Sequence, residues 1–285
     1  MSYTVEVFER NPSFAGFAET HEPIRYSKIH PDCELYLITP WKPRSQHPPK
    51  RPLIVFIQGS GWTHPGPHME LPQLSMFARR GFVVASVIHR NAVEGHPFPA
   101  YLEDVKTAVR FLRAHADEYG IDENRVCAWG TSSGGNTALL LGVTANDERY
   151  ETREYADFSD EVCAVVDFFG PTEIRELTHY PLNSPMWEDI FNGLAGKNDP
   201  EEVMRAMSPV YEVRDGSSYP PMLIVHGDAD HLVPFRQSEL MAERLSETGN
   251  EVTLVRVPGA DHESDTWSEA ILERVYRFLK DKLNP

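Results

Sequence analysis

Long hydrophobic runs are missing from this sequence. No stretch of eighteen consecutive apolar residues occurs in its 285 residues, so no segment has the composition of a transmembrane helix. Basic residues are scarce as well: 27 lysines and arginines stand against 43 aspartates and glutamates, which gives a formal net charge of −16. A chain this acidic is repelled by phosphate backbones and anionic lipid surfaces. We therefore expect neither a nucleic-acid-binding nor a membrane-binding protein.

Cysteine is rare too. The three cysteines, Cys33, Cys127 and Cys163, are odd in number and lie in apolar runs that predict strands. Buried, reduced thiols are expected instead of a disulfide framework. The first ten residues lack a basic segment followed by an apolar stretch, which is the pattern of a secretion signal. We expect a soluble, cytoplasmic protein.

Predicted strands and helices alternate along most of the chain. Continuous apolar runs that end in glycine or polar residues are typical of strands covered on both faces, and the segments between them have helical periodicity. This alternation implies right-handed crossovers and a mostly parallel central sheet with helices on both faces. The predicted strands are 24–29, 34–39, 53–58, 82–89, 126–130, 162–169, 222–226 and 252–257, and the predicted helices are 71–80, 99–119, 133–143, 234–248 and 267–283.

Two segments interrupt the alternation. Residues 145–161 carry seven acidic residues and two arginines, which predicts a solvated helix and loop without a chemical role. Residues 171–221 form a long insertion between two predicted strands, and connections of this length usually serve a function such as capping a site. With no internal repeat and no low-complexity linker, we expect one domain over residues 1–285, with 171–221 as a cap.

One short motif indicates nucleophilic chemistry. Residues 130–134 read G-T-S-S-G, which matches G-x-S-x-G, and they lie between a predicted strand and a predicted helix. This strand-turn-helix is the context of a nucleophile elbow, in which the central serine, here Ser132, projects from a sharp turn. Ser133 fits this role less well, because the flanking glycines would then be misplaced. The alternative interpretation is a serine-rich helix cap.

A serine hydroxyl needs a base that is oriented by an acid. In this strand-turn-helix context the chain order is serine, acid, histidine, with acid and histidine on loops after later strands. His262 follows the predicted strand 252–257, and both Asp228 and Asp230 follow the predicted strand 222–226. From position alone, either aspartate is a candidate acid, Asp230 could instead cap the next helix, and His262 could be a surface residue.

Residues 58–62, Q-G-S-G-W, follow the first long apolar strand. Small residues there free backbone N–H groups to face a substrate carbonyl, so Ser60 and Gly61, together with Ser133, are candidates for an oxyanion hole. The alternative is a plain glycine-rich turn. Trp62, and Trp187 and Phe191 in the insertion, are candidates for an aromatic substrate pocket or for ordinary packing of the cap.

From about Pro52 to the C-terminus the sequence resembles bacterial esterases of the hormone-sensitive-lipase-like branch, especially the acetyl-xylan and feruloyl esterases. The matching motifs are GSGW at 59–62, GTSSGG at 130–135, HGDADHLVP at 226–234 and GADH at 259–262. The resemblance implies the α/β-hydrolase fold and selects Asp230 as the acid. It implies short acyl esters as substrates, such as acetyl or hydroxycinnamoyl groups on a sugar. The family's usual H-G-G-G-W loop is changed here, with Gln58 in place of the histidine and Ser60 in place of the middle glycine.

Other activities remain open at this stage. An amidase or peptidase of the arylformamidase or prolyl-oligopeptidase type shares the elbow and triad, and a silent homologue that only binds a small ligand is the alternative outside enzymes. No metal or organic cofactor is expected, since Pro65 and Pro67 break the helical spacing of His64 and His68. The expected partner is a small-molecule ester, and the oligomeric state is left open, with a homodimer compatible with the sequence.

Overall fold

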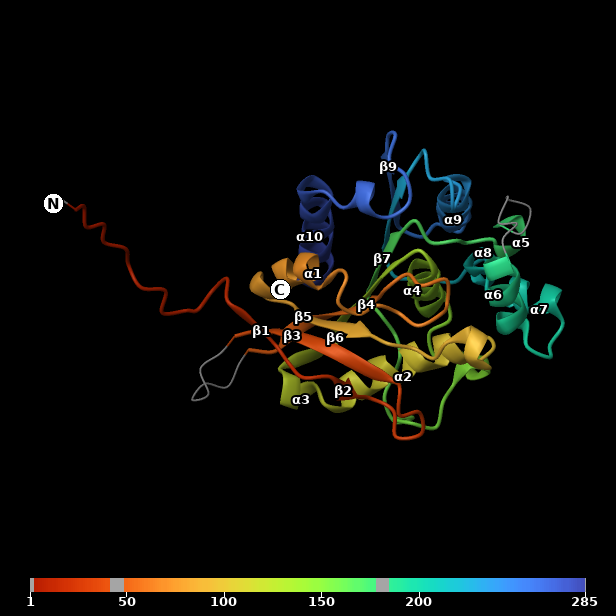
Figure 1. Cartoon of the computed structure of the whole chain (residues 1–285), viewed down its shortest axis with the longest axis horizontal. Helices are drawn as coiled ribbons and strands as arrows, with labels where there is room; N and C mark the ends of the chain where they lie inside the picture. The colour runs from red at the N-terminus through yellow and green to blue at the C-terminus, as the bar shows by residue number, and fades with distance from the viewer. Residues whose placement is uncertain (1–2, 42–48, 178–184, 285) are drawn as a thin grey trace.

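A mostly parallel β-sheet runs through the molecule (Figure 1). The computed structural model describes residues 3–41, 49–177 and 185–284, and in this part of the chain the sheet has nine strands, ordered β1-β3-β5-β4-β6-β7-β8-β9 with β2 beside β3. β3 is antiparallel to β1, β2 and β5, and every pairing from β5 to β9 is parallel. The strands are β1 (Ala18–Thr20), β2 (Ile24–Arg25), β3 (Glu34–Pro40), β4 (Arg51–Ile57), β5 (Val83–Val87), β6 (Ile121–Thr131), β7 (Ala164–Phe168), β8 (Met222–Gly227) and β9 (Val252–Val257).

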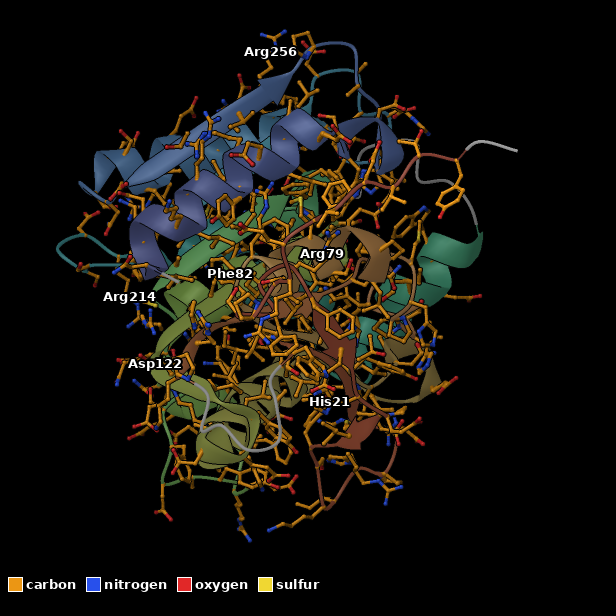
Figure 2. The ribbon with its side chains drawn as sticks, turned by 90° about the vertical axis from the view of Figure 1, so that its left-hand side faces the viewer. His21, Arg79, Phe82, Asp122, Arg214 and Arg256 are labelled. Atoms are coloured by element: carbon orange, nitrogen blue, oxygen red, sulfur yellow. The ribbon has the colours of Figure 1, made fainter. Side chains whose placement is uncertain are left out.

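Helices cover both faces of this sheet, as the continuous apolar strands require. In β4, Leu53 and Val55 point into one apolar core and Ile54 and Phe56 into the other. α2 (Ala100–Ala114), α4 (Ser133–Val143) and α9 (Arg236–Glu247) pack on the first core, and α1 (Leu71–Arg79) and α10 (Glu269–Leu283) pack on the second. In Figure 2 this second face is turned toward the viewer, and the labelled Phe82 packs edge-on against Tyr276 of α10 with ring centroids 6.3 Å apart. The predicted mostly parallel α/β sandwich is confirmed.

Most predicted elements agree with the observed ones. The strand predicted at 24–29 is shorter, since β2 spans only Ile24–Arg25, and β1 was not predicted. The predicted helix 99–119 divides at His115 into α2 and the short α3 (Ala116–Tyr119). The strand predicted at 126–130 begins earlier, since β6 includes the polar residues 122–125. No helix in the described ranges is long and apolar enough to cross a membrane. Cys33 and Cys127 are buried free thiols, as predicted, whereas Cys163 is half-buried.

The insertion at 171–221 packs over one end of the sheet (Figure 1). Its described elements are α5 (Ile174–Leu177), α6 (Pro185–Ala195), α7 (Pro200–Ala206) and α8 (Pro209–Glu212), and its residues 178–184 lie outside the described part of the chain. A third apolar cluster joins Ile174 and Leu194 of these helices to Trp62, Tyr101 and Leu140 of the main body. The insertion is therefore held against the main body by an apolar cluster that is separate from the two cores of the sheet.

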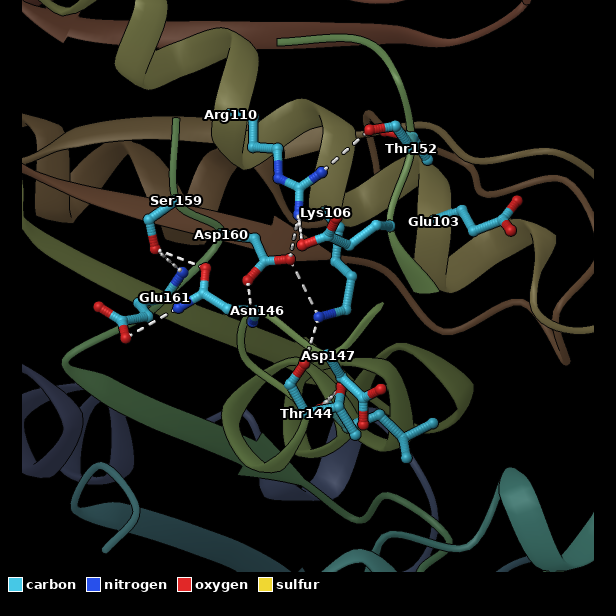
Figure 3. A network of polar contacts seen from close by, with 12 residues as sticks. Glu103, Lys106, Arg110, Thr144, Asn146, Asp147, Thr152, Ser159, Asp160 and Glu161 are labelled. Atoms are coloured by element: carbon cyan, nitrogen blue, oxygen red, sulfur yellow. Dashed lines mark hydrogen bonds and ion pairs between the residues drawn. The ribbon is translucent and has the colours of Figure 1, made fainter. Parts of the chain in front are cut away.

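The acidic segment 145–161 is not simply solvated, contrary to the sequence-based expectation. Asp160 is fully buried and its Oδ2 accepts hydrogen bonds from Lys106 Nζ and Arg110 Nη2, each at 3.0 Å (Figure 3). Its Oδ1 accepts the Asn146 N–H at 2.7 Å. Lys106 and Arg110 lie on α2, so the network ties the segment to the helix layer. The pattern of charges in the sequence did not distinguish Asp160 from its solvated neighbours.

Candidate active site

The turn between β6 and α4 holds Ser132 in a strained conformation. Its backbone has φ 51° and ψ −123°, a combination that residues other than glycine rarely adopt. A Cβ added to Gly130 would lie 2.0 Å from the Gly134 carbonyl oxygen, and one added to Gly134 would lie 2.0 Å from the Ile57 carbonyl oxygen. Both glycines of the motif are therefore required because backbone segments approach them too closely for any side chain. Ser132 also lies at the N-terminus of α4, where the helix dipole favours negative charge.

Three side chains from distant parts of the chain meet at this turn. His262 Nε2 lies 3.0 Å from Ser132 Oγ, and His262 Nδ1 lies 2.7 Å from Asp230 Oδ2. Asp230 follows β8 and His262 follows β9, so each lies beyond the carboxyl end of a parallel strand, where sites of open α/β sheets form. The His262 side chain is 9 % exposed and that of Asp230 is fully buried. This arrangement can move a proton from Ser132 to His262 with the carboxylate behind the imidazole.

The surroundings of Asp230 keep its carboxyl group ionised. Burial alone would raise its pKa, but hydrogen bonds from His226 and His262 outweigh burial and hold the pKa of Asp230 well below its usual range. Its Oδ1 accepts the backbone N–H groups of Leu232 at 2.9 Å and Val233 at 2.8 Å. All four donors face one carboxylate, which therefore remains an anion at neutral pH.

Asp228, the alternative acid from the sequence, lies elsewhere. Its carboxylate accepts hydrogen bonds from Arg256 Nε and the Gly259 N–H, both at 2.6 Å. These contacts brace the loop that leads from β9 to His262. The structure therefore brings Asp230, and not Asp228, to the imidazole.

The predicted oxyanion loop is close to the serine, with one difference. The Ser60 N–H, which we expected to face the substrate, donates instead to Ser133 Oγ at 2.9 Å. The Gly59 N–H likewise donates to Thr131 Oγ1 at 2.8 Å. The Ser133 side chain supplies an acceptor that no motif pattern indicates. Of the predicted donors, the N–H groups of Gly61 and Ser133 have no such side-chain acceptor in the hydrogen bonds described.

A cavity of about 650 Å³ opens beside Ser132. Trp187 lines it, but Trp62 and Phe191 do not: Trp62 is only 2 % exposed and both pack in the third apolar cluster. Trp62 turns inward because its ring joins the apolar residues beneath the insertion. The cavity is lined by Gly59, Ser60, Gly61, Thr63, Val93, Ser132, Trp187, Asp189, Ile190, Leu232, His262 and Glu263.

Acidic groups dominate the electrostatics of this cavity. Asp189 and Glu263 line it, and none of its lining residues is a lysine or arginine. Burial raises the pKa of Glu263, and burial together with the nearby Glu263 raises the pKa of Glu70 to about 7. Within the described residues, no group of three or more histidine, cysteine, aspartate or glutamate side chains is placed to hold a metal ion. A larger cavity of about 900 Å³ lies at the other end of α4, away from Ser132.

Sequence reasoning missed two residues that contact the side chains of His262 and Asp230. Phe169, which follows β7, packs its ring on His262 with centroids 4.6 Å apart, and its own backbone has φ 45°. His226, the first residue of the HGDADHLVP motif, lies 3.1 Å from Asp230 Oδ2 through its Nε2. Both residues lie at the carboxyl ends of parallel strands, and this position in the sequence is the signal that could have identified them.

The mostly parallel sheet, the helices on both faces and the strained serine at the end of β6 define an α/β-hydrolase. Comparison with known families is more specific. The BD-FAE family model matches residues 41–245, and the chain belongs to this family.

Relatives and solved structures agree with this assignment. Esterase LipC of Mycobacterium tuberculosis is 29 % identical over 90 % of this chain and 64 % of its own length. The probable carboxylic ester hydrolase LipM of the same organism is 25 % identical over 92 % of this chain and 63 % of its own length. The chain thus spans somewhat less than two thirds of these relatives.

Among structures, a truncated carbohydrate esterase from gut microbiota has a TM-score of 0.81 and 25 % identity, and the match covers 97 % of this chain and all (100 %) of that one. Butyrate-bound esterase 2 of Thermogutta terrifontis has a TM-score of 0.74 and 29 % identity, with 95 % of each chain covered.

Proposed function

We propose that this protein is a serine esterase that hydrolyses short-chain acyl esters through Ser132, His262 and Asp230. The observation that carries the proposal is the position of the His262 ring, with one nitrogen 3.0 Å from the serine hydroxyl and the other 2.7 Å from a buried, ionised carboxylate. A histidine held in this way is a general base aimed at a nucleophile.

In the first half of the proposed reaction, Ser132 Oγ attacks the ester carbonyl while His262 Nε2 accepts the hydroxyl proton. Asp230 holds the proton on Nδ1, so that Nε2 is the free base, and stabilises the imidazolium that forms. The tetrahedral intermediate collapses when His262 returns the proton to the leaving alcohol, which leaves an acyl group on Ser132.

In the second half, His262 takes a proton from water while the water oxygen attacks the acyl carbonyl. The second tetrahedral intermediate then breaks its bond to Ser132 Oγ, which regains the proton from His262 as the carboxylic acid is released. Both tetrahedral intermediates carry a negative oxygen, which the backbone N–H groups of Gly61 and Ser133 stabilise. The Ser60 N–H joins them only if the Ser133 hydroxyl releases it. Losing one such donor typically costs about 3–4 kcal/mol of transition-state stabilisation.

Cavity size and charge support a small, uncharged substrate. A volume of about 650 Å³ accommodates a short acyl group and a small alcohol such as a sugar. Asp189 and Glu263 at its wall disfavour anionic esters and offer acceptors for hydroxyl groups. A carbohydrate esterase and a butyrate-bound esterase are among the similar structures. We therefore propose acetyl or feruloyl esters of carbohydrates as the substrate class.

The chain is proposed to act as one α/β-hydrolase domain over residues 1–285, with 171–221 as a cap. Support comes from Trp187 and Ile190, which α6 of the insertion contributes to the cavity wall beside Ser132. A cap that lines the cavity can limit both the length of the acyl group and the access of water.

The test is hydrolysis of p-nitrophenyl acetate and butyrate, together with the corresponding acetyl anilide, by the wild type and by Ser132→Ala. We expect ester turnover with acetate favoured, little anilide turnover, and loss of activity in Ser132→Ala. A fluorophosphonate probe should label the wild type alone.

Anilide turnover faster than ester turnover would replace this proposal with an amidase. Absence of both turnover and labelling in the wild type would indicate a protein that binds a ligand without reacting. Acetylated and feruloylated xylo-oligosaccharides, assayed by release of acetate or ferulate, test the substrate class separately.

A further inference from the structure

A second histidine lies behind the proposed triad. His226, near the carboxyl end of strand β8, is fully buried, and its ring makes edge contacts with those of Phe169 and Phe235. It does not line the cavity, so it has no route to a bound ester. Its ring nitrogens nevertheless contact the carboxylate on which the proposed reaction depends.

The contacts of His226 determine where its proton lies. Nε2 is 3.1 Å from Asp230 Oδ2 and 2.9 Å from the Val233 carbonyl oxygen. Both atoms are acceptors only, so Nε2 must carry the proton and donate it. Nδ1 lies 2.7 Å from Ser238 Oγ, a hydroxyl that can donate. The ring is therefore satisfied on both sides as a neutral tautomer.

The hydrogen bonds then form one directed chain. Ser238 donates to His226, and His226 donates to Asp230 Oδ2. From the other side, Ser132 donates to His262, and His262 donates to the same Oδ2 atom. One carboxylate oxygen thus receives an N–H group from each of two histidines, one buried behind it and one beside the serine.

We propose that His226 is a positioning residue that aims Asp230 Oδ2 at His262 and moderates the negative charge the imidazole experiences. This inference rests on the proposed function, because it assigns His226 a role in the same reaction. The His226 N–H fixes the plane of the carboxylate, which the backbone N–H groups of Leu232 and Val233 hold from the other side. His226 is also the largest of the influences that lower the pKa of Asp230.

Other charged groups face this cluster. Glu263 interacts electrostatically with both His262 and Asp230, and Glu70 interacts with Glu263. These groups are the same in every variant described below. A change in pH dependence between variants at position 226 therefore reports the missing donor.

The experiment compares three variants with the wild type on p-nitrophenyl acetate between pH 5 and 9. His226→Phe removes the donor but keeps a ring, His226→Gln returns an N–H donor near the Nε2 position, and Ser238→Ala disturbs the same cluster while Nε2–H keeps its two acceptors. Circular dichroism and fluorophosphonate labelling establish that each variant is folded with a competent serine.

For His226→Phe we expect kcat to fall about 10- to 100-fold, with KM within about twofold, because the residue does not contact substrate. The acidic limb of the kcat/KM profile should move about 0.5–1 pH unit to higher pH, since the full carboxylate charge then stabilises the imidazolium. His226→Gln should recover most of kcat and the original limb. Ser238→Ala should lose less kcat than His226→Phe, and its kcat/KM profile should keep the acidic limb at the pH of the wild type.

A purely structural role would produce a different result. Equal losses in His226→Phe, His226→Gln and Ser238→Ala, with the acidic limb unmoved, would overturn the inference while leaving the esterase proposal intact. If His226→Phe does not fold, His226→Gln and Ser238→Ala still decide, because a greater loss in Ser238→Ala than in His226→Gln contradicts the assignment. An active Ser132→Ala variant would instead overturn the proposed function itself.

Discussion

Replacing Asp230 by asparagine should disable the site through the tautomer of His262. Two backbone N–H groups face Asp230 Oδ1, and the N–H groups of His226 and His262 face Oδ2. An amide has one acceptor oxygen, so its NH₂ group must meet one of these pairs of donors. If the oxygen keeps the backbone pair, the NH₂ faces the imidazole and His262 adopts the tautomer with its proton on Nε2. That nitrogen then faces Ser132 and cannot accept its proton.

The expected magnitude follows from this wrong tautomer. A triad aspartate changed to asparagine with its geometry intact lowers kcat by about 10⁴-fold in serine proteases, and we expect about 10³- to 10⁴-fold here. This corresponds to about 4–5.5 kcal/mol of lost transition-state stabilisation. The buried amide facing two donors also costs about 1–3 kcal/mol of folding stability.

The assay is steady-state hydrolysis of p-nitrophenyl acetate, with urea unfolding to show that Asp230→Asn remains folded. Asp228→Asn is the matched control, since Asp228 contacts Arg256 and Gly259 but not the imidazole. It should keep most of kcat, because its carboxylate does not contact the imidazole and acts only on the loop that leads to His262. If Asp230→Asn kept more than a tenth of kcat while Asp228→Asn lost it, Asp228 would be the acid and the reasoning above would be refuted.

Three further changes test the scaffold. Gly134→Ala should abolish soluble folding or activity, because the new Cβ would lie 2.0 Å from the Ile57 carbonyl oxygen, which is backbone and cannot move aside. Asp160→Asn leaves two buried cations without their carboxylate and should lower the free energy of unfolding by about 3 kcal/mol or more in urea titrations. Asp167 is fully buried, and burial raises its pKa to about 8, so its stabilising contribution is present below pH 4 and is lost as pH rises toward 8. Asp167→Asn should therefore gain stability relative to the wild type by up to about 1.4 kcal/mol per pH unit across that window.

Each of these has a matched comparison. Gly66→Ala places its Cβ 3.4 Å from the flexible end of the Gln58 side chain and should fold normally. If Gly66→Ala failed to fold as Gly134→Ala does, the close approach of backbone at Gly134 would not explain the failure. Asp117→Asn breaks an exposed ion pair with Lys50 and should leave the urea midpoint unchanged. A stability difference between Asp167→Asn and the wild type that stays constant from pH 5 to pH 8 would show that Asp167 is ionised in the folded protein.

The layers of the fold could be predicted because their signal is local. Each parallel strand is a short apolar run and each covering helix has one apolar face, so the order of elements follows from composition along the chain. The positions of Ser132 and His262 could be predicted for the same reason, since each lies in the turn or loop that follows a strand. Position alone left Asp228 and Asp230 both open as the acid, and only the family resemblance selected Asp230. Parallel strands bring their carboxyl ends to one edge of the sheet.

The features that could not be predicted depend on contacts between segments far apart in the sequence. Asp160 differs from the other acids of its segment only through Lys106 and Arg110, about fifty residues earlier. Trp62 turns away from the cavity because the insertion supplies an apolar cluster on its other side. Neither partner can be read from the residues near Asp160 or Trp62.

The Ser60 N–H illustrates how one side chain changes the chemistry of a motif. The sequence pattern of small residues after β4 predicts free donors, and it contains no information about what faces them. Ser133 lies on the other side of the turn and its hydroxyl takes the Ser60 donor at 2.9 Å. The number of donors that face a developing oxyanion therefore depends on the residue that follows the nucleophile as much as on the loop that carries the donors. Where that residue is alanine, no hydroxyl competes and the same loop would offer one N–H group more.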